Sequence, residues 1–116
     1  MDTPTQAYLL RVFIGESDKV ENQPLYEWLV KQAKSRGMAG ATVLRGMMGF
    51  GAHTKIIHTF KIERLSEDLP IIIEIVDSQD KIEDFLSFAE AHIKRGILAT
   101  VEKVEMRIYR GGKPGD

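Results

Sequence analysis

The sequence predicts an α+β protein whose elements follow the order β-α-β-β-α-β. Four segments have the alternating or fully apolar character of strands, and two segments carry apolar residues at the spacing of one helix face. The chain has 116 residues, of which 43% are hydrophobic and 28% are charged, so it suits one globular domain. We place that domain at residues 1–116, with its core at about residues 8–110 and a tail at 111–116.

The first strand is predicted at residues 8–14. One of its two faces carries three aliphatic residues, Leu10, Val12 and Ile14. A polar loop at residues 15–23 follows. Pro24 then opens a helix, because its missing N–H costs nothing in a first turn, and Gly37 ends that helix.

The segment after this helix is rich in glycine. A strand is predicted at residues 41–44, and three glycines then fall within residues 46–51, which favours a bent backbone. Residues 55–63 alternate again. They form either an arm or an edge strand, and the pattern leaves that choice open.

The second half repeats the strand–helix–strand order. Residues 71–76 are almost all apolar, which is typical of a strand buried on both faces. A helix begins at residues 77–80 and ends at 94–96. Its apolar face is the clearest helical pattern in the chain: Ile82, Phe85, Leu86, Ala89 and Ile93. The last strand is predicted at residues 104–109, where apolar and polar side chains alternate.

This element order is that of the split β-α-β, or ferredoxin-like, plan, in which two helices cover one face of a four-stranded sheet. The other face is expected to carry five apolar or aromatic residues: Leu9, Phe13, Ile72, Val76 and Tyr109. An apolar sheet face of this size has to be covered. We therefore expect further copies of the same chain to bury it.

Composition excludes several function classes. The chain contains no cysteine, which rules out disulfides, thiolate metal sites and cysteine nucleophiles. Its net charge is −1, so a general nucleic-acid binder is not expected. The N-terminal residues lack the pattern of a secretory signal, and no apolar run is long enough for a membrane span. We therefore expect a cytoplasmic protein.

The polar residues form no recognisable catalytic motif. There is no G-x-S-x-G turn and no H-E-x-x-H pair, and the adjacent Glu83 and Asp84 do not face each other on a helix. We therefore expect a protein that is not an enzyme. A metal site built from His53 and His58 stays an alternative, provided that the chain folds back between them.

Charge is distributed unevenly along the chain. Residues 28–62 contain no acidic side chain, whereas residues 63–90 contain nine. The glycine segment lies in the acid-free stretch, with Arg45 before it and Lys55 after it. Glycines let backbone N–H groups turn toward an anion. The pattern therefore indicates either a local anion site or solvated faces that are uneven by chance.

Five motifs occur in a characteristic order: Gly40-Ala41-Thr42-Val43, Gly49-Phe50-Gly51, Leu69-Pro70 before Ile73-Glu74-Ile75-Val76, Arg95-Gly96, and Arg107-Ile108-Tyr109-Arg110-Gly111. Together they resemble the PII signal-transduction proteins. With Pro24-Leu25-Tyr26 and the run from Leu65 to Pro70, the chain resembles more closely a PII-like family known as domain of unknown function one-ninety. The resemblance covers about residues 8–110.

The resemblance implies a homotrimer with its sheets facing inward and an adenine nucleotide in the clefts between subunits. It implies that Thr42 lies near the base, that Gly49, Phe50 and Gly51 wrap the phosphates, and that Arg107 contacts them. Arg95 and Gly96 match the turn after the second helix. The residues expected to supply positive charge are Arg45, Lys55, Arg95, Arg107 and Arg110.

The chain also departs from the PII pattern. Residues 97–101 replace a glycine-rich run that ends in lysine, and His53-Thr54 replaces a glutamine. With fewer phosphate ligands, AMP, ADP or a cyclic nucleotide is easier to accommodate than ATP. No cofactor is expected to be required. The loop at residues 47–66 is expected to respond to the ligand and to meet a protein partner, for which the family association suggests a membrane channel or transporter.

The alternative interpretation is a PII-like trimer for metal binding or metal tolerance, as one branch of these proteins implies. It would use the loop histidines His53 and His58. A hydrolase in the same cleft would need a general base, and the sequence assigns none.

Overall fold

The computed structural model describes residues 4–51, 68–94 and 96–111. Its elements are β1 (Thr5–Gly15), β2 (Lys19–Val20), β3 (Gln23–Pro24), α1 (Leu25–Ser35), β4 (Gly40–Arg45), β5 (Pro70–Asp77), α2 (Gln79–His92) and β6 (Leu98–Met106). Apart from the small β2–β3 hairpin, this is the predicted β-α-β-β-α-β order. The hairpin lies inside the segment that was predicted as a loop.

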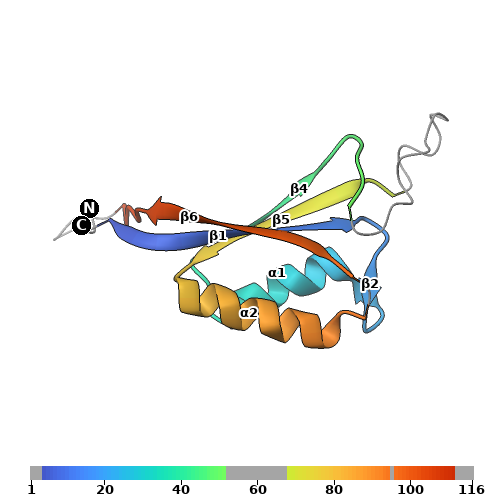
Figure 1. The fold of residues 1–116 in the computed structure, drawn as a ribbon, viewed down its shortest axis with the longest axis horizontal. Coiled ribbons are helices and arrows are strands. Elements are labelled where there is room, and N and C mark those ends of the chain that lie inside the picture. Colours follow the sequence, from blue (N-terminus) through green and yellow to red (C-terminus); the bar gives the residue numbers. More distant parts are fainter. Residues whose placement is uncertain (1–3, 52–67, 95, 112–116) are drawn as a thin grey trace.

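Four strands form one sheet in the order β4-β5-β1-β6, and every neighbouring pair is antiparallel. β1 and β4 therefore run in the same direction with β5 inserted between them, as the split β-α-β plan requires. Figure 1 shows α1 and α2 on the same side of the sheet. The structure thus confirms the predicted ferredoxin-like topology.

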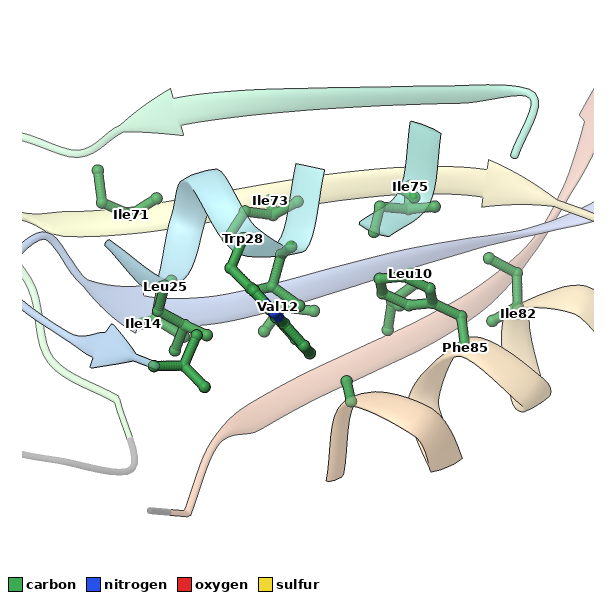
Figure 2. Packing of buried hydrophobic residues seen from close by; sticks show 14 residues of the cluster. Leu10, Val12, Ile14, Leu25, Trp28, Ile71, Ile73, Ile75, Ile82 and Phe85 are labelled. Carbon is green, nitrogen blue, oxygen red and sulfur yellow. The ribbon is translucent and has the colours of Figure 1, made fainter. Parts of the chain in front are cut away.

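The core lies between this sheet and the two helices. β1 contributes Leu10, Val12 and Ile14, and β5 contributes Ile71, Ile73 and Ile75 at alternate positions. These side chains meet Leu25 and Trp28 of α1 and Ile82 and Phe85 of α2, as Figure 2 shows. The core is almost entirely aliphatic or aromatic. Alternation along each strand directs the apolar set of side chains to the sheet face that the helices cover.

The helix ends follow from local sequence, with small shifts from the predicted bounds. Pro24 has φ −57° and ψ 132° and stands at the N-cap of α1, so the helix begins one residue later than predicted. Gly37 adopts φ +72°, the left-handed conformation that ends a helix. The Ser78 hydroxyl accepts a hydrogen bond from the Lys81 N–H at 3.4 Å and caps α2, which ends at His92 rather than at residues 94–96.

The predicted position of the last strand was wrong. β6 begins at Leu98 and ends at Met106, and it pairs with β1 from Phe13–Leu98 to Thr5–Met106. Its bounds are set by this pairing, because β1 begins at Thr5 and offers no partner farther along. Tyr109 therefore lies beyond the sheet with 68% of its surface exposed, and it does not belong to the uncovered sheet face.

The uncovered face of the sheet, on the side away from the helices, is arranged in rows that run across all four strands. One row is apolar and consists of Leu44, Ile72, Phe13 and Leu98, which stand opposite one another in the strand register. Leu9 and Val76 also lie on this face and pair with each other. The predicted apolar character of the face is therefore confirmed for its four strand residues, though not for Tyr109.

The next row of this face is polar. It consists of Thr42, Glu74, Arg11 and Thr100. The Arg11 Nε donates to Glu74 at 2.9 Å, and the Arg11 Nη1 donates to Glu102 on β6 at 2.5 Å. The hydrogen bonds to Glu74 and then to Glu102 raise the pKa of the Arg11 guanidinium above its ordinary value.

Neither described helix combines the length and the apolar character that crossing a bilayer requires. The alternating segment at residues 55–63, predicted as an arm or an edge strand, lies outside the described residues.

Candidate functional site

The glycine segment 46–51 leaves β4 and folds back over the beginning of β5. The Gly46 N–H donates to the Pro70 carbonyl at 2.7 Å. A Cβ at Gly46 would lie 2.9 Å from the Pro70 Cγ, so a side chain there would have to displace the proline ring. Gly49 adopts φ +151°, a backbone conformation that favours glycine. Glycine is therefore required at these positions for the loop to lie against the sheet end.

A cavity of about 240 Å³ lies beside this segment. It is lined by the end of β1, the glycine segment and the beginning of β5: Phe13, Ile14, Gly15, Asp18, Gly46, Met48, Gly49, Phe50, Gly51, Pro70 and Ile72. Most of the lining side chains are apolar, and Asp18 supplies a carboxylate. The cavity thus combines backbone groups that can donate hydrogen bonds with a largely apolar wall, which is typical of small-molecule sites.

The connection between β1 and β2 forms one rim of this cavity. The Gly15 N–H donates to the Asp18 Oδ2 at 2.9 Å, and the Ser17 N–H donates to the Asp68 Oδ1 at 2.9 Å. The Glu16 N–H donates to the Leu69 carbonyl at 2.8 Å. These bonds fix residues 15–18 against the segment that leads into β5, and they bring three carboxylates to the same end of the sheet.

This acidic cluster is the feature that sequence reasoning missed. The glycine segment lies in an acid-free stretch of sequence, yet the fold places Asp18 in the wall of the same cavity, Glu16 against Arg45, and Asp68 against the backbone of Ser17. Arg45, predicted to supply positive charge next to the glycines, is paired with Glu16, with Nη2 and Oε2 2.5 Å apart. Only the pairing of β1 with β5 would have revealed this arrangement, because the acids belong to segments far from the glycines in sequence.

A second cavity of about 490 Å³ lies on the other side of residues 15–18. It is bounded by the β2–β3 hairpin and by the chain after α2, and it includes Lys19, Glu21, His92, Lys94 and Gly96. Asp18 lines both cavities. The predicted site residue Gly96 is therefore close to the glycine end of the sheet but belongs to a separate hollow.

The structure brings some predicted site residues together and separates others. Arg45, Gly49, Phe50 and Gly51 gather at one end of the sheet, whereas Thr42 lies in the polar row of the uncovered face.

Arg107 and Arg110 follow Met106, the last residue of β6. In Figure 1, this end of β6 lies at the opposite end of the sheet from the end of β4. The Phe13–Leu98 pair and the Thr5–Met106 pair are separated along β6 by roughly 26 Å, at about 3.3 Å per residue. Arg107 donates to Glu105 at 2.5 Å. Within one chain, the C-terminal arginines therefore do not reach the glycine segment.

Four predicted residues lie outside the described part of the chain: His53, Lys55, His58 and Arg95. The metal alternative rests on two of them and stays a prediction. Within residues 4–51, 68–94 and 96–111, no group of three histidine or acidic side chains could hold a metal ion. The remaining histidine, His92, has its Nδ1 2.9 Å from the Phe88 carbonyl of its own helix.

Comparison with known sequences places the chain among uncharacterised relatives. The family model DUF190, described as Uncharacterized ACR, matches residues 7–106. A UPF0166 protein of Aquifex aeolicus is 42% identical over 98 residues, which cover 84% of this chain and 90% of the relative. A UPF0166 protein of Methanocaldococcus jannaschii is 34% identical over 106 residues, which cover 91% of this chain and 94% of the relative.

Comparison with solved structures shows the fold. A PII-like signalling protein of Thermus thermophilus superposes with a TM-score of 0.62 at 18% identity, over 91% of this chain and 93% of that chain. The PII-like protein CPII of Thiomonas intermedia, bound to ADP, AMP and acetate, superposes with a TM-score of 0.58 at 16% identity, over 92% of this chain and 94% of that chain. The chain therefore belongs to the DUF190 family and has the α+β fold of PII-like proteins.

Proposed function

We propose that this protein is a PII-like regulatory protein that binds an adenine nucleotide in a cleft completed by a second copy of the chain. The observation that carries the proposal is the separation of the glycine segment from the C-terminal arginines by the length of the sheet. A glycine loop with an apolar cavity and a pair of arginines are complementary parts of a nucleotide site, and only two chains can bring them together.

The assembly that we propose is a homotrimer with the uncovered sheet faces turned inward. The apolar row supports it, because Leu44 and Leu98 are 44% and 45% exposed in the single chain and flank the half-buried Phe13 and Ile72. Covering such a row removes apolar surface from water, at about 25 cal/mol per Å². In this arrangement, the glycine segment of one chain and Arg107 of its neighbour line the same cleft.

The proposed ligand is AMP, ADP or a cyclic nucleotide rather than ATP. The solved complexes of CPII with ADP and AMP support an adenine nucleotide. The acidic side chains beside the glycine segment disfavour a long phosphate chain, because like charges repel at short range. Binding is expected to act as a signal, and the proposal includes no catalytic step and no required cofactor.

The proposed partner surface includes the beginning of the 47–66 loop. Met47, Met48 and Phe50 are 88%, 69% and 62% exposed in the described part of this loop. Exposed methionines and aromatic residues favour contacts with other proteins. The partner that we propose for this surface is a membrane channel or transporter.

A thermal-shift panel of AMP, ADP, ATP and cyclic AMP tests nucleotide binding. A ligand present at about one hundred times its Kd stabilises the folded protein by about 2.7 kcal/mol. We expect a clear rise in melting temperature with AMP or ADP and a smaller one with ATP. Absence of any shift at millimolar concentrations, with and without magnesium, would exclude the proposed function.

Mixed assemblies test whether the site is shared between chains. Gly49→Val disrupts the loop conformation, because Gly49 adopts a backbone conformation that favours glycine. Arg107→Gln removes the positive charge. Each variant alone should therefore lose ADP binding. When the two variants are refolded together, about a quarter of the clefts should combine an intact loop with an intact arginine. Calorimetry should then recover part of the ADP sites. A mixture that binds no more ADP than either parent would contradict a shared cleft.

A further inference from the structure

Arg45 is the cation that adjoins the glycine segment in the described part of the chain. It is the last residue of β4 and immediately precedes Gly46, whose backbone lines the smaller cavity. Its Nη2 lies 2.5 Å from the Glu16 Oε2. The Arg45 side chain is 61% exposed, whereas the Glu16 side chain is 21% exposed. The two members of the pair thus differ in how firmly the protein surrounds them.

Glu16 is the anchored member of the pair. Its backbone N–H donates to the Leu69 carbonyl at 2.8 Å, and the next N–H, of Ser17, donates to the Asp68 Oδ1 at 2.9 Å. The backbone at Glu16 is therefore fixed, next to Gly15 of the cavity wall, and the Glu16 side chain is largely enclosed. Arg45 reaches it through a long, exposed side chain, so the guanidinium can move away while the carboxylate stays.

We infer that Glu16 is a specificity-determining residue, which holds Arg45 in the ligand-free protein and competes with the ligand's phosphate for its guanidinium. This inference rests on the proposed nucleotide site. A guanidinium pairs with a carboxylate or a phosphate through the same fork of N–H donors, so it cannot fully satisfy both at once. The apparent affinity for a phosphorylated ligand is then lowered by the fraction of Arg45 that is free.

The same geometry makes the competition depend on the charge of the ligand. When Arg45 turns to the phosphate, the Glu16 carboxylate loses its partner, and Asp18 and Asp68 are bound to the backbone of the adjacent residues Gly15 and Ser17. The repulsion between these carboxylates and the ligand grows with each negative charge on the phosphate chain. Glu16 therefore discriminates among AMP, ADP and ATP, with the largest penalty on ATP.

Calorimetric titration of AMP, ADP and ATP, without magnesium, into wild-type protein and Glu16→Gln tests this inference. The substitution keeps the shape of the side chain and removes its charge. Because exposed ion pairs have modest strength, we expect the affinity for ADP to rise about two- to fivefold, with a larger gain for ATP than for AMP. The matched control is Glu21→Gln, which removes an exposed glutamate that lines the other cavity and should change none of the three affinities.

A double-variant comparison separates competition for Arg45 from a general change in charge. In an Arg45→Gln background, Glu16→Gln should give a smaller gain, because no guanidinium remains to be released. An equal gain in both backgrounds, or no gain in wild-type background, would overturn the competition while leaving nucleotide binding intact. If none of the proteins binds any of the three nucleotides, the proposed function itself fails, and this inference fails with it.

Discussion

The two faces of the central sheet are built from the same strands but have different patterns. The face toward the helices carries two aliphatic rows across all four strands, one through Val12 and one through Leu10, and Leu10, Ile73 and Ile75 are fully buried there. The uncovered face alternates an apolar row through Phe13 with a polar row through Arg11. One face is completed by the chain's own helices, whereas the other has the mixed apolar and polar character that we propose to be covered by further copies of the chain.

The difference between the faces also predicts where stability and function reside. Side chains on the covered face hold the single chain together, so their loss should unfold it. Side chains on the uncovered face contribute little to the isolated chain. In the homotrimer that we propose, their loss should separate the copies and thereby open the nucleotide clefts. Substitutions on each face can therefore test the comparison directly.

The largest effect is expected on the covered face. Phe85 is 1% exposed and packs in the core between α2 and the sheet (Figure 2), so Phe85→Ala should lower the free energy of unfolding by about 3–5 kcal/mol. Urea titration followed by circular dichroism measures this change. Phe50→Ala, at a residue 62% exposed, is the control and should stay within about 0.5 kcal/mol. Similar losses for the two variants would contradict the assignment of the core.

The next effect is expected on the uncovered face. Phe13→Asp places a charge in the middle of the apolar row, so it should dissociate the assembly while the helices and strands remain. Light scattering should give a mass near the 13.1 kDa of one chain instead of a multiple of it. Ser87→Asp is the control, because Ser87 is exposed on α2, on the other side of the sheet. A Phe13→Asp protein that keeps the wild-type mass would show that this face is not the interface.

Much of the fold could be predicted from the sequence because periodicity is a local property. Ile82, Phe85 and Ala89 recur at helical spacing and are buried in α2 as expected, and the alternation in β1 marks both faces of the sheet. The position of β6 could not be predicted in the same way. β6 is an edge strand, and seven of its nine residues are polar, small or exposed. Its bounds are therefore set by pairing with β1 and not by an alternation of apolar and polar residues.

The candidate site was predicted less well because its parts come from distant segments. The glycines could be identified from sequence, since three of them in a short stretch favour a bent backbone. The carboxylates of Glu16 and Asp68 reach this loop only through the pairing of β1 with β5. A stretch of sequence without acids therefore does not guarantee a basic environment in the folded protein, and the ion pair of Arg45 with Glu16 is the direct example.

The smallest effect is expected in the polar row of the uncovered face. Arg11 binds Glu74 and Glu102 through two different nitrogens, and a lysine has only one nitrogen to offer. Arg11→Lys should therefore leave the unfolding of the single chain almost unchanged. It should raise the protein concentration at which the assembly dissociates, by less than Phe13→Asp does. The ion triad of Arg11, Glu74 and Glu102 is 32–54% exposed in the single chain, and the proposed assembly would bury it between chains.

Analytical ultracentrifugation at low and high salt measures this dissociation, with Lys103→Arg on the exposed edge of β6 as the control. The loss in Arg11→Lys should be greatest at low salt, where the unpaired glutamate repels its neighbours most strongly. A dissociation concentration equal to that of the wild type at both salts would place the polar row outside the interface. The apolar row alone would then define the contact between copies, and the ion triad would serve only to pair β5, β1 and β6 within each chain.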